Sequence, residues 1–192
     1  MSGLFFGGSR SLPSSFFGLV RAVVAAAAPG AGWVSCGCAA GADQAVVAAL
    51  LALGWAALLR LFCVGAPSGA GFWSGSAPVS LFRAAAAAGA SVSWLAGGVL
   101  SVPLRARLLR RSLAALPGCS AAVFFLASPA PSGSLTIAAA AVSLFRLPVF
   151  VFPCGFSVLP AGLAGCAGAW VPAVFCGFPC LRWAPAACQL SF

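Results

Sequence analysis

The sequence predicts an α/β fold in which helices cover both faces of a parallel sheet. Short apolar runs alternate with longer stretches rich in alanine and leucine, and glycine or proline separates the two kinds of segment. This alternation is typical of strand–helix–strand units, whose successive strands run parallel. The chain of 192 residues is also long enough for one domain with a full core. We therefore expect a single Rossmann-like domain over residues 1–156.

Each element is predicted from its residue types and from the residues at its ends. Asp43 suits the N-cap of a helix that Gly54 ends. Pro103 opens a later helix, and Pro117 closes it. We expect helices over 14–28, 43–53, 79–88, 103–117 and 135–144. We expect strands over 4–6, 33–35, 61–64, 91–95, 121–126 and 149–152.

The two signs of charge are represented very unevenly. The chain has ten arginines and one acid, and it lacks Lys, Glu, His, Tyr and Asn altogether. All five missing types have adenine as the second base of their codons, so the mean hydropathy of +1.11 reflects a bias in the gene and overstates the case for a membrane protein. The net charge of +9 favours anionic partners such as nucleic acid, nucleotides or acidic lipid headgroups. The alternative is that arginine serves solubility alone.

Apolar runs are interrupted before they reach the length of a membrane span. The run 44–59 would form about 24 Å of helix, against a hydrocarbon core of about 30 Å, and Gly54 interrupts it. The longer run 147–181 contains several prolines and is no single helix. We expect no stable membrane insertion and a cytoplasmic location, with a membrane-associated protein as an alternative.

The nine cysteines show no regular spacing. The closest groups, which are candidate metal ligands, are Cys36 with Cys38, and Cys176 with Cys180, with Cys188 beyond. No histidine or further paired thiol motif supports them, and buried thiols pack as small hydrophobic groups in a reduced compartment. We expect no metal and no cofactor. The last three lie in 157–192, which we expect to be an irregular Pro/Gly/Cys-rich tail packed on the same domain.

Three glycine-rich turns each follow a predicted strand. They are Gly7-Gly8-Ser9-Arg10, the segment 37–43, and Ser132-Gly133-Ser134. In a parallel sheet such turns meet at one edge, where ligands bind in a crevice. Glycine lets the backbone approach a ligand closely, and the helix starts beyond these turns offer free N–H groups to a phosphate. We therefore expect a phosphate-bearing ligand on these turns.

Arg105, Arg107, Arg110 and Arg111 form the only cluster of charge in the sequence. At 100° per residue, Arg105 falls on the apolar helix face that meets the sheet. A charge there is costly unless it is paired, so we expect Arg105 to contact the ligand. The other three are expected to form a stripe that is either solvated or faces nucleic acid. Phe72-Trp73, in the longest glycine-rich loop, either stacks on a base or pins the loop to the core.

The inventory of side chains limits the chemistry that the chain can perform. With one acid and no His, Lys or Tyr, it has no paired carboxylates, no His-based acid–base group, and no Cys–His or Ser–His nucleophile. We expect the one acid, Asp43, to be used as a helix cap. These absences disfavour an enzyme and favour a binding module.

Several short motifs occur in the order of a known family. Gly8-Ser9-Arg10 resembles the first-strand G-S-R turn of the DprA/Smf family, and 35–43 resembles its S-G-x-A-x-G-I-D turn, with a cysteine inserted or one glycine displaced. The segment 103–107 resembles P-x-R-N-R. The segments 132–136 and 149–155 resemble S-G-S-L-x-T-A and V-F-A-V-P-G. Together they span 4–155 and indicate a DprA/Smf-like member of the SLOG superfamily, which includes the "lonely guy" phosphoribohydrolases.

The resemblance implies single-stranded DNA binding in the crevice, delivery of that DNA to a recombinase, and a homodimer. This sequence departs from the family at Ala106, where the family has Asn, and at Val47, where a His usually follows the Asp. Against the phosphoribohydrolase motif P-G-G-x-G-T-x-x-E, Leu135 replaces a glycine and Ala139 replaces the glutamate. The loss of that acid argues against glycosidic hydrolysis.

The sequence thus predicts non-enzymatic binding of single-stranded DNA or a nucleotide phosphate in a glycine-rich crevice, as in a DprA-like mediator of DNA processing and recombination. The alternative within the superfamily is a nucleotide-derived ligand sensor or a phosphoribohydrolase-like enzyme. The predicted binding residues are Gly8, Ser9, Arg10, Gly37, Gly41, Asp43, Arg105, Arg107, Ser132, Gly133, Ser134 and Thr136.

Overall fold

A computed structural model describes residues 2–186 and confirms the α/β class. The strands are β1 (Gly3–Gly8), β2 (Trp33–Cys36), β3 (Leu59–Phe62), β4 (Ser91–Ser93), β5 (Cys119–Leu126), β6 (Val149–Pro153), β7 (Gly168–Phe175) and β8 (Phe178–Pro185). The helices are α1 (Phe17–Ala27), α2 (Ala42–Ala52), α3 (Val79–Ala87), α4 (Leu104–Ala114) and α5 (Gly133–Ser143). Short 3₁₀ turns, η1 (Ser14–Phe16), η2 (Ala28–Gly30) and η3 (Ala56–Leu58), flank α1 and precede β3.

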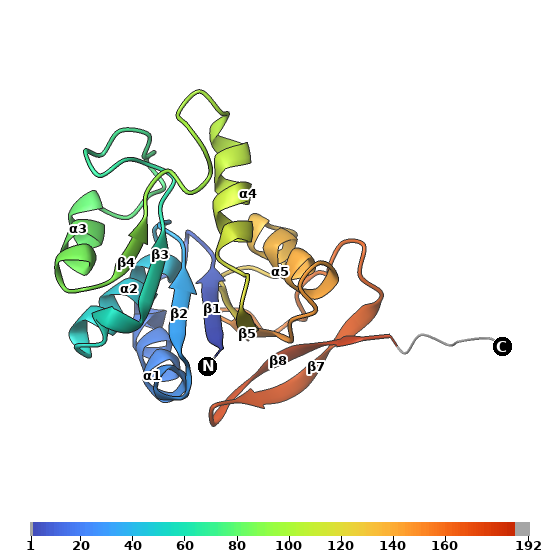
Figure 1. Cartoon of the computed structure of the whole chain (residues 1–192). Helices are drawn as coiled ribbons and strands as arrows, with labels where there is room; N and C mark the ends of the chain where they lie inside the picture. Colours follow the sequence, from blue (N-terminus) through green and yellow to red (C-terminus); the bar gives the residue numbers. More distant parts are fainter. Residues whose placement is uncertain (1, 187–192) are drawn as a thin grey trace.

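All the described strands join one sheet in the order β4-β3-β2-β1-β5-β6-β8-β7. Neighbours from β4 to β6 are parallel, while β8 runs antiparallel to both β6 and β7. The chain moves outward from β1 to β4 and then returns to place β5 on the other side of β1 (Figure 1). This reversal of direction is the topological switch point of a Rossmann-like sheet, and it lies between β1 and β5.

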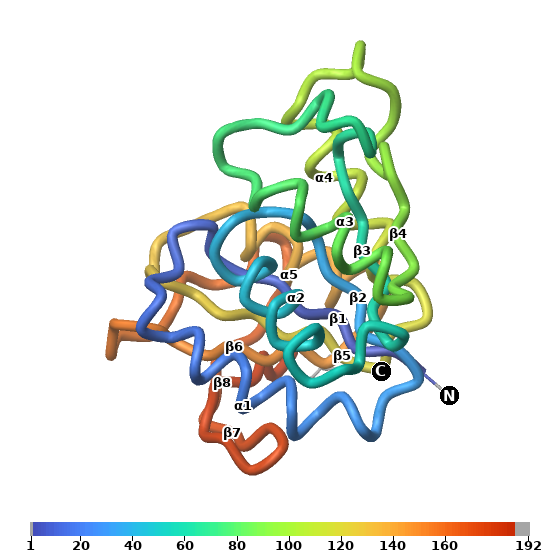
Figure 2. Tube along the Cα trace, turned by 90° about the vertical axis from the view of Figure 1, so that its left-hand side faces the viewer, coloured from blue at the N-terminus to red at the C-terminus, as the bar shows by residue number. Residues whose placement is uncertain are grey.

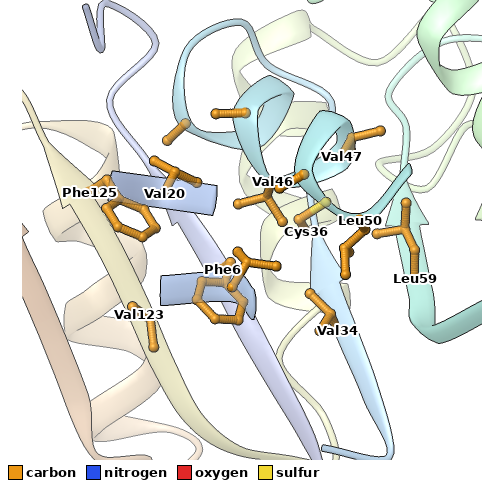
Figure 3. Close-up of a cluster of buried hydrophobic side chains, with 14 of the residues drawn as sticks. Phe6, Val20, Val34, Cys36, Val46, Val47, Leu50, Leu59, Val123 and Phe125 are labelled. Atoms are coloured by element: carbon orange, nitrogen blue, oxygen red, sulfur yellow. The ribbon is translucent and has the colours of Figure 1, made fainter. Parts of the chain in front are cut away.

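Two hydrophobic clusters cover the two faces of the sheet. One contains the buried side chains of α1, α2 and α3, and the other contains those of α5 and of the segment that follows α4. Successive residues of a strand point to opposite faces, so Phe6 joins the first cluster and Phe5 the second. In Figure 3, Phe6 and Phe125 from neighbouring strands lie among side chains such as Val20 and Val46. The prediction of helices on both faces is therefore confirmed.

The helices are short, and each of α1, α2, α4 and α5 has 11 residues. Such a helix is about 16 Å long at 1.5 Å per residue. No helix within residues 2–186 is both long and apolar enough to cross a membrane.

Two long loops rise from the end of the sheet where β3 and β4 terminate, at 63–78 and 94–103 (Figure 2). They are joined by backbone hydrogen bonds, from Leu95 N–H to the carbonyl of Gly65 at 3.1 Å and from Ala96 N–H to the carbonyl of Cys63 at 2.8 Å. The second loop leads directly into α4. The loop pair therefore fixes the position at which α4 begins.

The segment after β6 differs from the predicted irregular tail. β7 and β8 form a hairpin with eight paired positions, and β8 attaches it to β6. Trp170 and Trp183 are buried under the hairpin in edge-to-face contact, with ring centroids 5.0 Å apart. The sequence does not predict these strands, because they contain Pro172, Pro179 and Pro185 and proline usually argues against a strand. Here Pro172 lies on the edge strand, where a missing N–H is tolerated.

Candidate functional site

A cleft of about 1500 Å³ lies at the carboxyl ends of β1 and β5. The turn after β1 and the loop before α5 line it, together with residues of α4 as far as Ser112 and residues of the segment after β6. This is the switch point of the sheet, where ligands of open α/β sheets bind. Of the twelve predicted binding residues, nine line the cleft: Gly8, Ser9, Arg10, Asp43, Arg105, Ser132, Gly133, Ser134 and Thr136.

The turn after β1 is held in place by Ser9. The Ser9 N–H donates to the carbonyl of Phe125 at 2.8 Å, and the Ser9 hydroxyl oxygen accepts from the N–H of Ala127 at 2.9 Å. These bonds join the ends of β1 and β5 below the cleft. The next residue, Arg10, is exposed and makes no hydrogen bond or ion pair within residues 2–186. Its guanidinium is therefore available to an anion in the cleft.

The start of α5 forms a second wall. Ser132 is the N-cap, and its hydroxyl oxygen accepts from the Leu135 N–H at 3.4 Å. The N–H groups of Gly133 and Ser134 begin the helix and have no partner inside it. A side chain added at Gly133 would meet nothing within 4 Å, so the described chain does not crowd this position at the helix start. Open amides at the positive end of a helix dipole form a phosphate-binding site.

The start of α4 forms a third part of the wall. Pro103 is the N-cap and provides no side-chain capping bond, and Arg105 in the first turn is exposed and lines the cleft. Arg105 makes no hydrogen bond or ion pair in the described chain. Like Arg10, it presents a charge to the cleft that no protein group neutralises.

The aliphatic surface of α4 was missed by sequence reasoning. Leu104, Leu108 and Leu109 line the cleft beside Arg105, and Leu109 is 42% exposed. Leucines at spacings of four and one could have indicated a partly exposed helix face. A helical wheel places Leu109 on the face that packs on the sheet, because the wheel does not show where the sheet ends.

Arg107 is not the exposed contact that was predicted. It is 7% exposed, does not line the cleft, and donates to the carbonyls of Val102, Val64 and Gly71 at 3.0, 2.9 and 3.3 Å. One guanidinium with five N–H donors thus satisfies three carbonyls of the two long loops. Arg107 is a structural clamp, and the prediction that it belongs to a solvated or nucleic-acid-facing stripe is wrong.

Arg111 also departs from the predicted stripe. It is 6% exposed and forms an ion pair with Asp43, with 3.1 Å between Nη1 and Oδ2. The same Oδ2 accepts from the Ala39 N–H at 3.1 Å. Burial raises the pKa of Asp43, although the Arg111 guanidinium acts to lower it. Burial acts to lower the pKa of Arg111, but Asp43, Cys38 and Cys36 together raise it above its usual value. Both residues lie at the base of the cleft, and their charges cancel there.

Asp43 is therefore not the helix cap that was predicted. Gly41 is the N-cap of α2, with φ of +72°, and Asp43 lies in the first turn of the helix. The carboxylate is engaged by Arg111 from α4, 68 residues further along the chain. The ion pair with Arg111 thus takes the place of the helix-capping role that an aspartate at this position suggests.

Gly37 and Gly41 do not line the cleft, and each has a structural reason to be glycine. A side chain at Gly37 would collide with the Arg111 guanidinium and the Asp43 carboxylate. A side chain at Gly41 would collide with the carbonyls of Ser9 and Arg10. The first N–H of α2, on Ala42, already donates to the Ser9 carbonyl at 3.1 Å. The glycine-rich segment 37–43 therefore supports the turn after β1.

Phe72 and Trp73 pin their loop to the core. The Phe72 ring stacks on Phe82 of α3 with centroids 5.7 Å apart, and both Phe72 and Trp73 pack against the first hydrophobic cluster. Neither residue lines the cleft. Of the two alternatives for this pair, the structure favours loop anchoring over base stacking.

Cys36, Cys38 and Cys63 are buried free thiols near the Asp43–Arg111 pair. Burial raises the pKa of Cys36, so this thiol stays protonated. Among residues 2–186, no three His, Cys, Asp or Glu residues are grouped so that they could hold a metal ion. Cys188 lies outside the described residues.

Fold and cleft together define a Rossmann-like α/β protein with a cleft at its switch point. The chain matches no family model, no curated protein and no solved structure. The resemblance to the DprA/Smf family therefore rests on the sequence motifs alone.

Proposed function

We propose that this chain binds single-stranded nucleic acid in the cleft at the switch point, without performing chemistry on it. The observation that carries the proposal is the convergence of three phosphate-binding features on one cleft. Arg10 and Arg105 are exposed on it without a protein partner in residues 2–186, and the open amides of Gly133 and Ser134 begin α5 beside it. Charge and helix-terminal amides together form the usual recognition set for phosphate.

The size of the cleft favours a polymer over a single nucleotide. Small-molecule sites typically measure about 300–1000 Å³. The cleft, at about 1500 Å³, exceeds that range. An extended strand can occupy such a groove with successive phosphates on its rim.

The aliphatic wall favours a single strand over a duplex. Leu104, Leu108 and Leu109 offer apolar surface next to Arg105, and unpaired bases offer apolar faces that a duplex hides in its stack. The rest of the role is proposed on the resemblance to the DprA/Smf family. On that basis the protein acts in the cytoplasm as a homodimer that delivers single-stranded DNA to a recombinase.

The proposal predicts that Arg105→Ala weakens DNA binding more than Arg110→Ala does. Arg105 lines the cleft, whereas Arg110 is exposed on the same helix outside it and serves as the matched control. Loss of a phosphate contact removes a charge-assisted bond, while loss of Arg110 removes only long-range attraction, which salt screens within about 10 Å at 0.1 M. The measurement is titration of a fluorescently labelled oligonucleotide against both variants and the wild type.

Repeating the titration at several salt concentrations counts the phosphate contacts. Each neutralised phosphate of a single strand contributes roughly −0.7 to the slope of log affinity against log salt, so Arg10 and Arg105 together predict about −1.4. Arg105→Ala should make the slope shallower by about 0.7, and Arg110→Ala should leave it nearly unchanged. Equal losses in the two variants would show that the cleft is not the binding site. Absence of binding by the wild type at low salt would refute the proposal as a whole.

A further inference from the structure

The two oxygens of the Asp43 carboxylate are in different situations. Oδ2 accepts from both the Ala39 N–H and Arg111 Nη1, each at 3.1 Å. Oδ1 receives no hydrogen bond from any residue in 2–186. Asp43 is only 5% exposed, yet it lines the cleft. An ionised carboxylate is acceptor-only, so Oδ1 is an acceptor on the cleft that the described chain leaves unused.

Gly7 keeps the space beside Oδ1 open. It lines the cleft, and a side-chain carbon added there would lie 3.8 Å from Asp43 Oδ1 and 3.0 Å from the ring of Phe5. Phe5 and Phe124, whose ring centroids are 5.5 Å apart, complete this part of the cleft. The free acceptor therefore faces the part of the cleft that these two rings line. A ligand N–H that reaches this oxygen would form a charge-assisted hydrogen bond with the carboxylate.

The polarity of the cleft changes from its mouth to its base. The exposed cations Arg10 and Arg105 and the start of α5 lie at the mouth, and the leucines of α4 form a wall. The buried pair of Asp43 and Arg111 lies at the base, where Oδ1 is the carboxylate oxygen that Arg111 does not engage. A nucleotide has the complementary order of charged phosphate, apolar base faces and polar base edge. A nucleotide bound in accordance with this match would have its phosphate outward and its base inward.

We propose that Asp43 Oδ1 accepts a hydrogen bond from the exocyclic amino group of a nucleobase, so that the cleft prefers amino-bearing bases to keto-bearing ones. The inference rests on the proposed function and adds to it a preference for base type. Asp and Glu side chains accept from the cytosine amino group in known protein–DNA contacts. Uracil differs from cytosine by a keto oxygen at the same ring position, and this oxygen would face the carboxylate oxygen and be repelled by it.

The test compares oligodeoxycytidine with oligodeoxyuridine of the same length, at low salt and neutral pH. Wild type should bind the cytosine strand about tenfold more tightly, within the range of discrimination that one base-edge contact provides. A strand of N4,N4-dimethylcytosine, which keeps the ring but has no amino donor, should lose this advantage. Equal affinity for all three strands would overturn the inference and leave phosphate binding in the cleft intact.

Asp43→Asn provides the reversed experiment. The Ala39 N–H and Arg111 both donate to the Oδ2 position, so the amide must place its oxygen there and its NH₂ group where Oδ1 was. The acceptor at the base of the cleft then becomes a donor, and the variant should prefer the uracil strand over the cytosine strand. A variant that is folded by circular dichroism but keeps the cytosine preference would overturn the inference. Failure of wild type to bind any strand would instead refute the proposed function.

Discussion

At the scale of single residues, the base of the cleft depends on one ion pair and on the glycine that makes room for it. Asp43 and Arg111 come from different helices and meet at 3.1 Å, and Gly37 lies against both side chains. A buried charge that loses its partner is strongly destabilising, because the remaining charge stays desolvated. Gly37 is therefore as important to this pair as the two charged residues are.

Gly37→Ala should lower the free energy of unfolding by about 3 kcal/mol or more, since the new methyl group would displace the Arg111 guanidinium from Asp43. The matched control is Gly18→Ala. Gly18 lies in α1, and a side chain there would meet nothing within 4 Å. The control should raise stability by about 0.5–1 kcal/mol, because alanine loses less backbone entropy in a helix. Urea denaturation measures the free energy of unfolding of both variants. Changes of similar size and sign would show that the effect of Gly37→Ala comes from backbone entropy and not from the ion pair.

Site residues with local causes were predictable, and those with distant partners were not. Arg10 lies in the turn after β1 and Ser132 in the loop after β5, so the glycine-rich turn pattern predicted their place at the cleft. Arg107 and Arg111 depend on groups 43 and 68 residues away in sequence. A helical wheel places charge on the outer face by default, and it contains no information about carbonyls or carboxylates that arrive from other elements.

At the scale of elements, the strands and helices from β1 to β6 follow the apolar runs of the sequence to within a few residues. The hairpin of β7 and β8 does not, because prolines interrupt its pattern and its strands lack clean alternation of buried and exposed positions. What holds the hairpin is long-range packing. Trp183 contacts Trp170 and belongs to the same buried cluster as β5 and α5.

Trp183→Ala should therefore destabilise the whole domain by about 3 kcal/mol or more, the usual cost of removing a buried tryptophan. Val174→Ala, on the neighbouring strand, serves as the control because Val174 is 67% exposed, and it should shift stability by less than about 0.5 kcal/mol. Guanidinium denaturation followed by far-UV circular dichroism measures both. If Trp183→Ala leaves the midpoint unchanged, the hairpin unfolds independently and is no part of the cooperative core.

At the scale of the whole molecule, the missing acids and histidines shape both binding and stability. Asp43 is engaged by Arg111, so the remaining nine arginines have no acidic side chain to pair with in the sequence. Repulsion among them is reduced when an anionic ligand binds, which links the proposed function to stability. Because the chain also has no Lys or Tyr, its thiols are the main side chains that lose a proton between neutral pH and the pH at which arginine does.

Stability should fall as pH rises above 9, because buried thiols resist ionisation. Burial raises the pKa of Cys154 from 9.0 to about 11. A group whose pKa is higher in the folded protein contributes stability that is fully present below the unfolded value and is lost as pH rises through the folded value, here between 9 and 11. The gap corresponds to at most about 2.7 kcal/mol, and screening by nearby solvent reduces the expected loss to about 1–2 kcal/mol.

Cys154→Ala should lose less stability than wild type between pH 8 and pH 11 in urea titrations under reducing conditions. Parallel losses in the two proteins would assign the alkaline effect to other groups, such as the buried Cys36.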